Sequence, residues 1–389
     1  MQKRNVIVCL IMFIGILFLL HNLKNPLYHQ VTIGISYSDP YKITEISTLC
    51  EYISIEIDDY CERTNSPYRF SFDIQYVPFI LNSEINVTRY FLDNNIRFIV
   101  GHDYSNQCKN TIKTLNEKEY ILISPYSSDI SLSVKNDNLF RLRSNDTYQG
   151  YMISEMLNKM NISYTYIISI NNTWGNIMRE SVEHYCHNHD INILATIKYH
   201  AIDEEFTSEL GLIEKDFIKF KTTYNEKKVG IVVLSLLEIC ELIEKVDENS
   251  SLLSIPWFST EVPTMGVVVE LFNDTFSNNF KKIELYCPSL LISNQDETTI
   301  QKDYQFKTGS HLDYTQAARY DAIWIYVLSI TEAQSTNVEA IKPKIPVIAN
   351  SYSGLTGNCA LNDFGDKKMA QYAIMIFKNP LGKKFIPLQ

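Results

Sequence analysis

The stretch FIVGHDYSNQ, residues 98–107, places an apolar run directly before a segment that can start a helix, and YILISPYSSD, residues 120–129, repeats the arrangement. Both runs are continuously apolar instead of alternating, which is typical of strands buried on both faces of a parallel sheet. Similar alternation extends from a strand expected at 31–38 to a long helix expected at 314–333. Repeated βα units with short connections predict an α/β fold with doubly wound, parallel-rich sheets.

The alternation of strands and helices breaks near 142–147 and then starts again. A chain of 389 residues is too long for one ordinary core, so we expect two lobes joined by a hinge that the chain crosses several times. The expected division is lobe 1 at 31–143 and 262–345, lobe 2 at 144–261 and 346–380, and a C-terminal tail at 381–389.

The first 30 residues differ in composition from the rest of the chain. Lys3 and Arg4 precede an apolar run from Val6 to Leu20, which spans ~22 Å as a helix and falls short of a bilayer core of ~30 Å. The length and the basic start predict a signal-anchor or signal peptide. No small-residue cleavage site follows, which favours an uncleaved anchor, with a cleaved signal as the alternative. Either reading predicts an extracytoplasmic protein, anchored to the cell membrane by this segment or secreted if it is cut.

Composition and motifs exclude several functions. The net charge of −10 argues against nucleic-acid binding, which needs a basic face. No nucleophile elbow, P-loop, dinucleotide fingerprint or zinc-protease motif occurs. The cluster of His184, Cys186, His187 and His189 resembles a metal site in composition, but a structural zinc needs four converging ligands, and a solvated helix end is the favoured explanation. We therefore expect no enzyme, no cofactor and no metal.

Small hydroxyl residues follow the two strands quoted above. Ser105 opens a helix after the first strand, and Ser128 follows the second. Ligands of parallel sheets bind outside the carboxyl ends of the strands, and a hydroxyl beside a helix N-terminus suits a carboxylate. The alternative is that both serines are only N-caps or turn residues.

The order of residues from 98 to 157 resembles the type I periplasmic binding proteins. This family includes the leucine/isoleucine/valine-binding proteins and the ligand-binding domains of metabotropic glutamate and natriuretic peptide receptors. Later segments follow in the family's order: YTYIISINNTWGNIM (164–178), KKVGIVVLSLLEICELI (227–243), IPWFSTE (255–261), ARYDAIWIYVLSI (318–330) and SGLTGNCALNDFGDKKMAQYAI (353–374). The resemblance implies the two-lobed fold of this family, whose lobes close on a ligand.

In the first lobe, the resemblance implies a ligand site in the loop after residue 124. Ser105 matches a serine that holds an amino-acid carboxylate, and Ser128 matches the hydroxyl residue that contacts the α-amino and α-carboxylate groups. Ser127 matches the small residue that contributes its backbone, and Tyr126 belongs to the same predicted site.

In the second lobe, the resemblance implies two further contacts. Trp174 stands where the family has Tyr or Phe and would wall the ligand, with a place in the lobe core as the alternative. Glu261 stands where the family often has an acid that pairs with an α-ammonium group, with an exposed loop acid as the alternative. Asp321 matches a residue that we expect to serve the scaffold.

The resemblance implies an extracytoplasmic solute-binding protein that captures a small amino-acid-like ligand, an amino acid or a related amide or urea-like solute. An ABC-type transporter permease in the membrane would receive it. A ligand-sensing ectodomain is the alternative, and an enzyme on a related scaffold is a third reading. The segment SYSDPYKITE, residues 36–45, replaces the family's glycine-rich turn. That turn often touches the ligand, so the ligand class stays open.

Overall fold

The computed structural model describes residues 28–115, 119–200, 202, 204–224, 228–264, 279, 282–292, 299–377 and 385–387. The predicted signal segment lies outside this range except for residues 28–30, where strand β1 begins at His29. Among the residues just given, no helix combines the length and the apolar character that crossing a bilayer requires.

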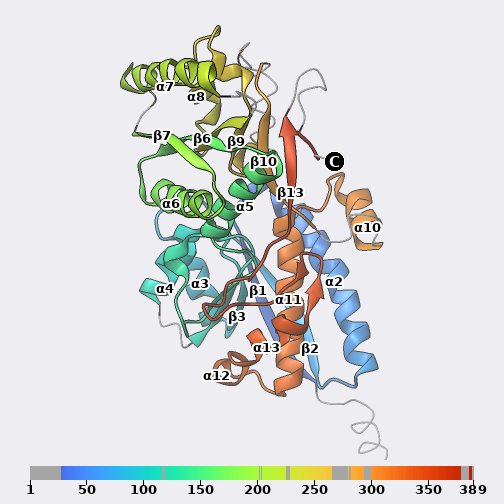
Figure 1. Ribbon diagram of the computed structural model, residues 1–389. Coiled ribbons are helices and arrows are strands. Elements are labelled where there is room, and N and C mark those ends of the chain that lie inside the picture. The colour runs from blue at the N-terminus through green and yellow to red at the C-terminus, as the bar shows by residue number, and fades with distance from the viewer. Residues whose placement is uncertain are drawn as a thin grey trace, which may run out of the picture.

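The first lobe is built on a five-stranded parallel sheet, drawn in the lower half of Figure 1. Its order is β2-β1-β3-β4-β5, from β1 (His29–Tyr37), β2 (Tyr68–Tyr76), β3 (Phe98–Val100), β4 (Ile121–Ser124) and β5 (Leu139–Arg141). The helices of this lobe are α2 (Ile43–Arg63), α3 (Ser83–Asp93), α4 (Ser105–Thr114), α11 (Tyr314–Ala333), α12 (Val338–Ile341) and α13 (Lys344–Ser351), with short 3-10 turns at Pro40–Lys42 and Ile130–Leu132.

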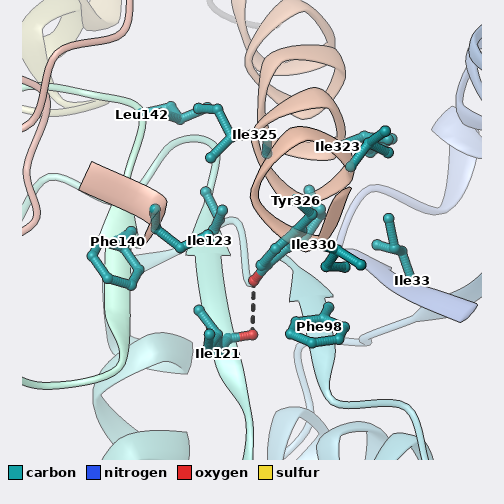
Figure 2. Close-up of a cluster of buried hydrophobic side chains, with 14 of the residues drawn as sticks. Ile33, Phe98, Ile121, Ile123, Phe140, Leu142, Ile323, Ile325, Tyr326 and Ile330 are labelled. Atoms are coloured by element: carbon teal, nitrogen blue, oxygen red, sulfur yellow. Dashed lines mark hydrogen bonds between the residues drawn. The ribbon is translucent and has the colours of Figure 1, made fainter. Parts of the chain in front are cut away.

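Side chains of this sheet alternate between two cores. Phe98 and Val100 pack into a cluster with α2 and α11, whereas Ile99 between them packs into a cluster with α3 and α4. Figure 2 shows the first cluster, in which the Tyr326 hydroxyl donates a hydrogen bond of 2.8 Å to the carbonyl oxygen of Ile121. Burial on both faces explains why these strands are apolar at every position.

The second lobe contains a seven-stranded sheet of order β14-β13-β10-β9-β8-β6-β7. Its strands are β6 (Tyr164–Ile170), β7 (Asn192–Tyr199), β8 (Val229–Leu234), β9 (Trp257–Ser259), β10 (Leu285–Leu290), β13 (Tyr372–Phe377) and β14 (Phe385–Pro387). Strand β13 pairs antiparallel with both β10 and β14, and all other neighbouring strands of this sheet pair parallel. Its helices are α5 (Asp146–Lys159), α6 (Thr173–Asn188), α7 (Glu204–Thr223) and α8 (Ile239–Glu244), with 3-10 turns at Ser251–Ser254 and Val262–Thr264. The predicted doubly wound, parallel-rich fold is thereby confirmed.

The later lobe boundaries differ from the expectation. The segment 262–345, expected in lobe 1, contains β10, which pairs parallel with β9 and antiparallel with β13 in the second sheet. The segment 346–380, expected in lobe 2, begins inside α13, whose Ile348 and Ala349 pack into the core of the first lobe. The hydrogen bonds of β10 therefore assign it to the second lobe. The apolar contacts of α13 assign it to the first lobe.

Part of the segment after β10 also differs. Helix α10 (Thr299–Thr308) lies in a largely polar stretch for which the sequence predicted no helix. Its Ile300 and Tyr304, four positions apart, are buried in a small cluster beside α2 and α11. A short hairpin of β11 (Ser353–Gly354) and β12 (Gly357–Asn358) lies in the return towards β13.

Two of the segments that connect the lobes are tied to each other. The hydroxyl of Ser144, just before α5, donates to the Lys367 carbonyl oxygen at 3.0 Å and accepts from the Ala370 N–H at 2.8 Å. The Tyr314 hydroxyl, at the start of α11, donates to the carbonyl oxygen of Leu142 at 2.8 Å. Hydrogen bonds therefore join the hinge segments to one another, although these segments are distant in the sequence.

Candidate functional site

A cavity of about 630 Å³ lies where the two lobes meet. Residues after β1, β3 and β4 line it from the first lobe, residues around the ends of β9 and β10 line it from the second, and the start of α11 closes it. Its lining includes Tyr37, Asp103, Tyr126, Glu261, Ser289 and Arg319. The carboxyl ends of parallel strands thus supply much of the wall, as the topology predicts.

Glu261 connects the lobes at this cavity. It follows β9, is only 4% exposed, and accepts a hydrogen bond of 3.0 Å at Oε1 from the hydroxyl of Tyr126, which follows β4. The same oxygen accepts a hydrogen bond from the guanidinium of Arg143. The alternative of an exposed loop acid is therefore wrong, because the Glu261 side chain is buried and ion-paired.

Arg143 completes this group from the first connection between the lobes. Its guanidinium carbon lies 4.2 Å from the centre of the Tyr126 ring, within the range of a cation–π contact. Burial alone would lower the pKa of Arg143, but the Glu261 carboxylate together with Tyr126, Tyr372 and Asp146 outweighs burial and holds that pKa well above its ordinary value. Burial and the same carboxylate raise the pKa of Tyr126. Arg143 therefore stays charged and Tyr126 stays a neutral donor.

A second buried ion pair joins Asp103 to Arg319. Asp103 follows β3 and accepts from the Ser38 N–H at 3.1 Å, while the Arg319 guanidinium bonds its other oxygen. Arg319 also donates to Gln316 Oε1 at 3.2 Å. Burial raises the pKa of Asp103, and the positive charge of Arg319 opposes that rise.

Lys42 supplies a third charge contact at the cavity. Its Nζ lies 2.7 Å from Glu45 Oε2 and 3.4 Å from Asp313 Oδ2. Burial alone would lower the pKa of Lys42, but these two carboxylates outweigh burial and raise it. Lys42 and Asp313 both line the cavity. The wall therefore combines charges of both signs that are already paired within the protein.

The predicted serines lie next to this cavity rather than in its lining. Ser105 Oγ accepts hydrogen bonds from the N–H groups of Ser128 (3.1 Å) and Asp129 (3.2 Å). Ser127 donates its N–H to Ser124 Oγ at 3.1 Å. Ser105 thus holds the loop that carries Tyr126. Direct contact of Ser105, Ser127 or Ser128 with a ligand stays a prediction.

Trp174 lies at the start of α6, at the carboxyl end of β6. Asn172 caps this helix by accepting from the Gly175 N–H at 2.7 Å. The indole is partly buried and packs against a core cluster that includes Met178 and Tyr286. The lobe-core alternative describes these contacts, and a role for Trp174 in ligand binding stays a prediction.

The structure adds cavity residues that the sequence did not indicate, namely Lys42, Asp103 and Arg319, and the ion-pair partner Arg143. Asp103 lies inside the quoted stretch 98–107, and Arg319 is a charge within an otherwise apolar helix, so both carried a signal. Within the described part of the chain, no group of three or more His, Cys, Asp or Glu side chains is placed to hold a metal ion.

Comparisons with known proteins agree with this architecture. A family model described as "receptor family ligand binding region" matches residues 62–379. The uncharacterized protein MJ1266 of Methanocaldococcus jannaschii is 20% identical over 344 residues, which are 84% of this chain and 81% of that protein.

Solved structures with the same fold include a substrate-binding protein of an ABC transporter from Desulfitobacterium hafniense, with a TM-score of 0.70 and 15% identity over 92% of this chain and 100% of that one. The branched-chain amino acid binding protein LivJ of Streptococcus pneumoniae, in complex with isoleucine, has a TM-score of 0.66 and 15% identity over 92% and 98% of the two chains. A solute-binding protein of Rhodopseudomonas palustris in complex with benzoate has a TM-score of 0.62 and 13% identity over 92% and 96%.

Proposed function

Because this chain belongs to the family of the receptor ligand binding region, whose model spans residues 62–379, we propose that it captures a small solute between its two lobes. The observation that carries the proposal is the cavity of about 630 Å³ between the lobes. Tyr126 from the first lobe and Glu261 from the second meet at this cavity through a direct hydrogen bond. A volume of this size suits a small molecule.

The proposed ligand is amino-acid-like. Structures of the same fold hold leucine, isoleucine or benzoate, all of which carry a carboxylate. Tyr126 and Glu261 are proposed to contact the ligand from the cavity wall. Ser105, Ser127 and Ser128 are proposed to contact the ligand from the first lobe, and Trp174 to cover the ligand from the second lobe.

The proposed role is delivery outside the cytoplasm. Several structures of this fold are substrate-binding proteins of ABC transporters, which supports a permease as the membrane partner. The apolar run from Val6 to Leu20, behind Lys3 and Arg4, is proposed to tether the protein to the membrane or to be cut as a signal peptide. A tether would raise the effective concentration of the protein at its permease. Capture and delivery need no chemical step, and the proposal assigns no enzymatic activity.

A ligand-sensing ectodomain is the second candidate, because the matching family model describes receptors. Affinity purification of the tagged full chain from membranes distinguishes the two. A permease and its ATPase in the eluate would support delivery, whereas a signalling protein would support sensing.

Calorimetry of the purified full chain tests solute capture directly. The titrants are leucine, isoleucine, benzoate, their amides and urea, and we expect at least one of them to bind. If none of them binds, the proposal fails.

Ser128→Ala tests the loop after β4. We expect about tenfold weaker binding, or ~1.4 kcal/mol, because the substitution removes the hydroxyl that is predicted to contact the ligand, while the Ser128 N–H keeps its bond to Ser105 Oγ. Ser131→Ala, an exposed serine on the following 3-10 turn, is the matched control and should bind as wild type. Equal affinities of both variants and wild type would remove Ser128 from the site.

A further inference from the structure

Buried carboxylates at the cavity already have cationic partners in the protein. The buried pairs are Glu261 with Arg143 and Asp103 with Arg319, and the partly exposed Asp313 is paired with Lys42. One further acid in the lining, Asp39, is exposed and accepts from the Tyr41 N–H at 2.9 Å. Among the lining residues that the structure describes, therefore, no buried carboxylate is left without a cation.

Arg143 bonds Glu261 Oε1, one of the two oxygens to which a ligand ammonium group would donate. The two side chains are only 5% and 6% exposed. A charge that loses its partner in such a site is strongly destabilised, because water does not replace the partner. An ammonium group that bound Glu261 Oε1 would have to displace the guanidinium and leave it buried without a counter-ion, and one that bound Oε2 would meet a carboxylate whose charge Arg143 already neutralises.

The wall keeps unused hydrogen-bonding capacity. Arg319 Nε is a buried donor without a partner, and Glu261 Oε2 is a buried acceptor without a partner among the described residues. Both residues line the cavity. Both atoms are buried, so a ligand group reaches them only after the side chains adjust. A carboxyl or carboxamide group would then accept from the donor, and a carboxamide would also donate to the acceptor.

We propose that Arg143 is a specificity-determining residue, because it neutralises Glu261 and so removes the ammonium requirement from the site. The solute is then an amino-acid-like molecule whose polar end is a carboxyl or carboxamide group without an ammonium group beside it. This inference rests on the proposed function, since it concerns the same cavity.

Matched solute triads test the inference in the full chain. One triad is leucine, 4-methylpentanoate and 4-methylpentanamide, and the other is phenylalanine, 3-phenylpropanoate and 3-phenylpropanamide. We expect an ammonium-free member to bind within about threefold of its amino acid, or tighter. The carboxylate and amide arms show which polar end is preferred.

Two outcomes count against the inference in different ways. If the amino acid binds about tenfold tighter than both of its ammonium-free partners, the inference is overturned while solute capture stands. If no member of either triad binds, and the wider panel of solutes also fails, solute capture itself is refuted and the inference falls with it.

Two variants with opposite charge changes sharpen the test. Arg143→Met frees the Glu261 carboxylate, and we expect it to shift the affinity ratio towards the amino acid by about tenfold. Glu261→Gln leaves Arg143 uncompensated, and we expect it to shift the ratio towards the carboxylate by a similar factor. Arg63→Met, which breaks an exposed ion pair with Asp59, is the control and should leave the ratio unchanged.

Arg143→Met buries a carboxylate without its partner and is the variant at greater risk of misfolding. Should it fail to fold, Glu261→Gln alone decides, because it keeps the cation and nearly the same shape. A ratio of carboxylate to amino acid that stays at the wild-type value in Glu261→Gln overturns the proposal.

Discussion

Arg141 and Asp366 form an ion pair that is almost wholly excluded from water, with 2.6 Å between Arg141 Nε and Asp366 Oδ1. Each side chain is 1% exposed, although the two residues are 225 positions apart. Arg141 also donates to the Asp129 carbonyl oxygen and to Ser133 Oγ, both at 2.8 Å. The pair attaches the segment that returns to the second lobe to the edge strand β5 of the first.

Asp366→Asn should lower the free energy of unfolding by about 3–5 kcal/mol, because it leaves the buried Arg141 without its counter-ion. Urea denaturation followed by circular dichroism measures this. Asp363→Asn removes an exposed acid, 84% accessible and paired with Lys135, and should change the free energy by less than about 0.5 kcal/mol. Similar losses in the two variants would contradict the assigned role of the buried pair.

Asp321→Asn should destabilise the protein by about 3 kcal/mol. Asp321 Oδ1 accepts from the Leu355 N–H at 2.8 Å, and Oδ2 accepts from the Thr356 N–H and hydroxyl at 2.9 and 2.6 Å. In the asparagine variant, an NH₂ group replaces one of the two carboxylate oxygens, so that a donor faces the N–H and hydroxyl donors of Leu355 and Thr356. Thermal unfolding is the measurement, with the exposed Asp58→Asn as control. The contacts bear out the expectation that Asp321 serves the scaffold, and an unchanged melting temperature would speak against it.

Gly175→Ala should destabilise the second lobe, because a Cβ at this position would lie 1.9 Å from the Ile170 carbonyl oxygen. Relief requires movement of the β6–α6 turn, so we expect a loss of about 2–3 kcal/mol. Gly211→Ala is the matched control, since a Cβ there meets nothing within 4 Å inside helix α7. That control should gain about 0.4–1 kcal/mol. Chemical denaturation distinguishes the two signs, and stabilisation by both substitutions would refute the steric argument.

Acid should weaken the fold through His102, whose pKa burial lowers to about 3. The imidazole lies between Ser36 Oγ at 2.9 Å and Thr88 Oγ1 at 3.0 Å and is fully buried. Below pH ~6.5 the unfolded chain binds a proton that the folded chain does not bind. The His102 contribution therefore falls by about 1.4 kcal/mol for each pH unit from pH ~6.5 down to ~3.

Unfolding free energies of wild type and His102→Gln, measured between pH 7 and 4, isolate this contribution. Buried acids such as Asp103 and Asp146, whose pKa values burial raises, act in the opposite direction but are common to both proteins. The variant should show a slope smaller by about 1.4 kcal/mol per pH unit. His184→Gln, on an exposed histidine, should keep the wild-type slope, and parallel slopes for wild type and His102→Gln would disprove the assignment.

Local patterns in the sequence predicted most elements of the fold. Strand β1 (29–37) and helix α11 (314–333) lie close to where the sequence indicated, because each is a long and largely apolar segment. The membership of β10 in the second sheet was not predictable in this way. A short apolar strand carries no mark of the strands with which it will pair, and its partner β13 lies far along the chain.

The candidate site was predicted in part for a related reason. The positions of Tyr126 and Glu261 at the ends of strands were expected, and both line the cavity. The pairing of Glu261 with Arg143 was missed, because these residues are 118 positions apart, Arg143 in the first connection between the lobes and Glu261 after β9 in the second lobe. Such a pair forms only when the lobes come together, so no local sequence pattern predicts it.

The hydroxyl of Ser144, bonded both to Lys367 and to Ala370, has a consequence for how the two lobes move. Segments that are joined side by side share any bending but resist being twisted past one another. We therefore expect the lobes to open and close mainly about one axis. Closure of the lobes then costs little conformational entropy in the connecting segments. Most of the free energy of the contacts with the solute therefore remains available as affinity.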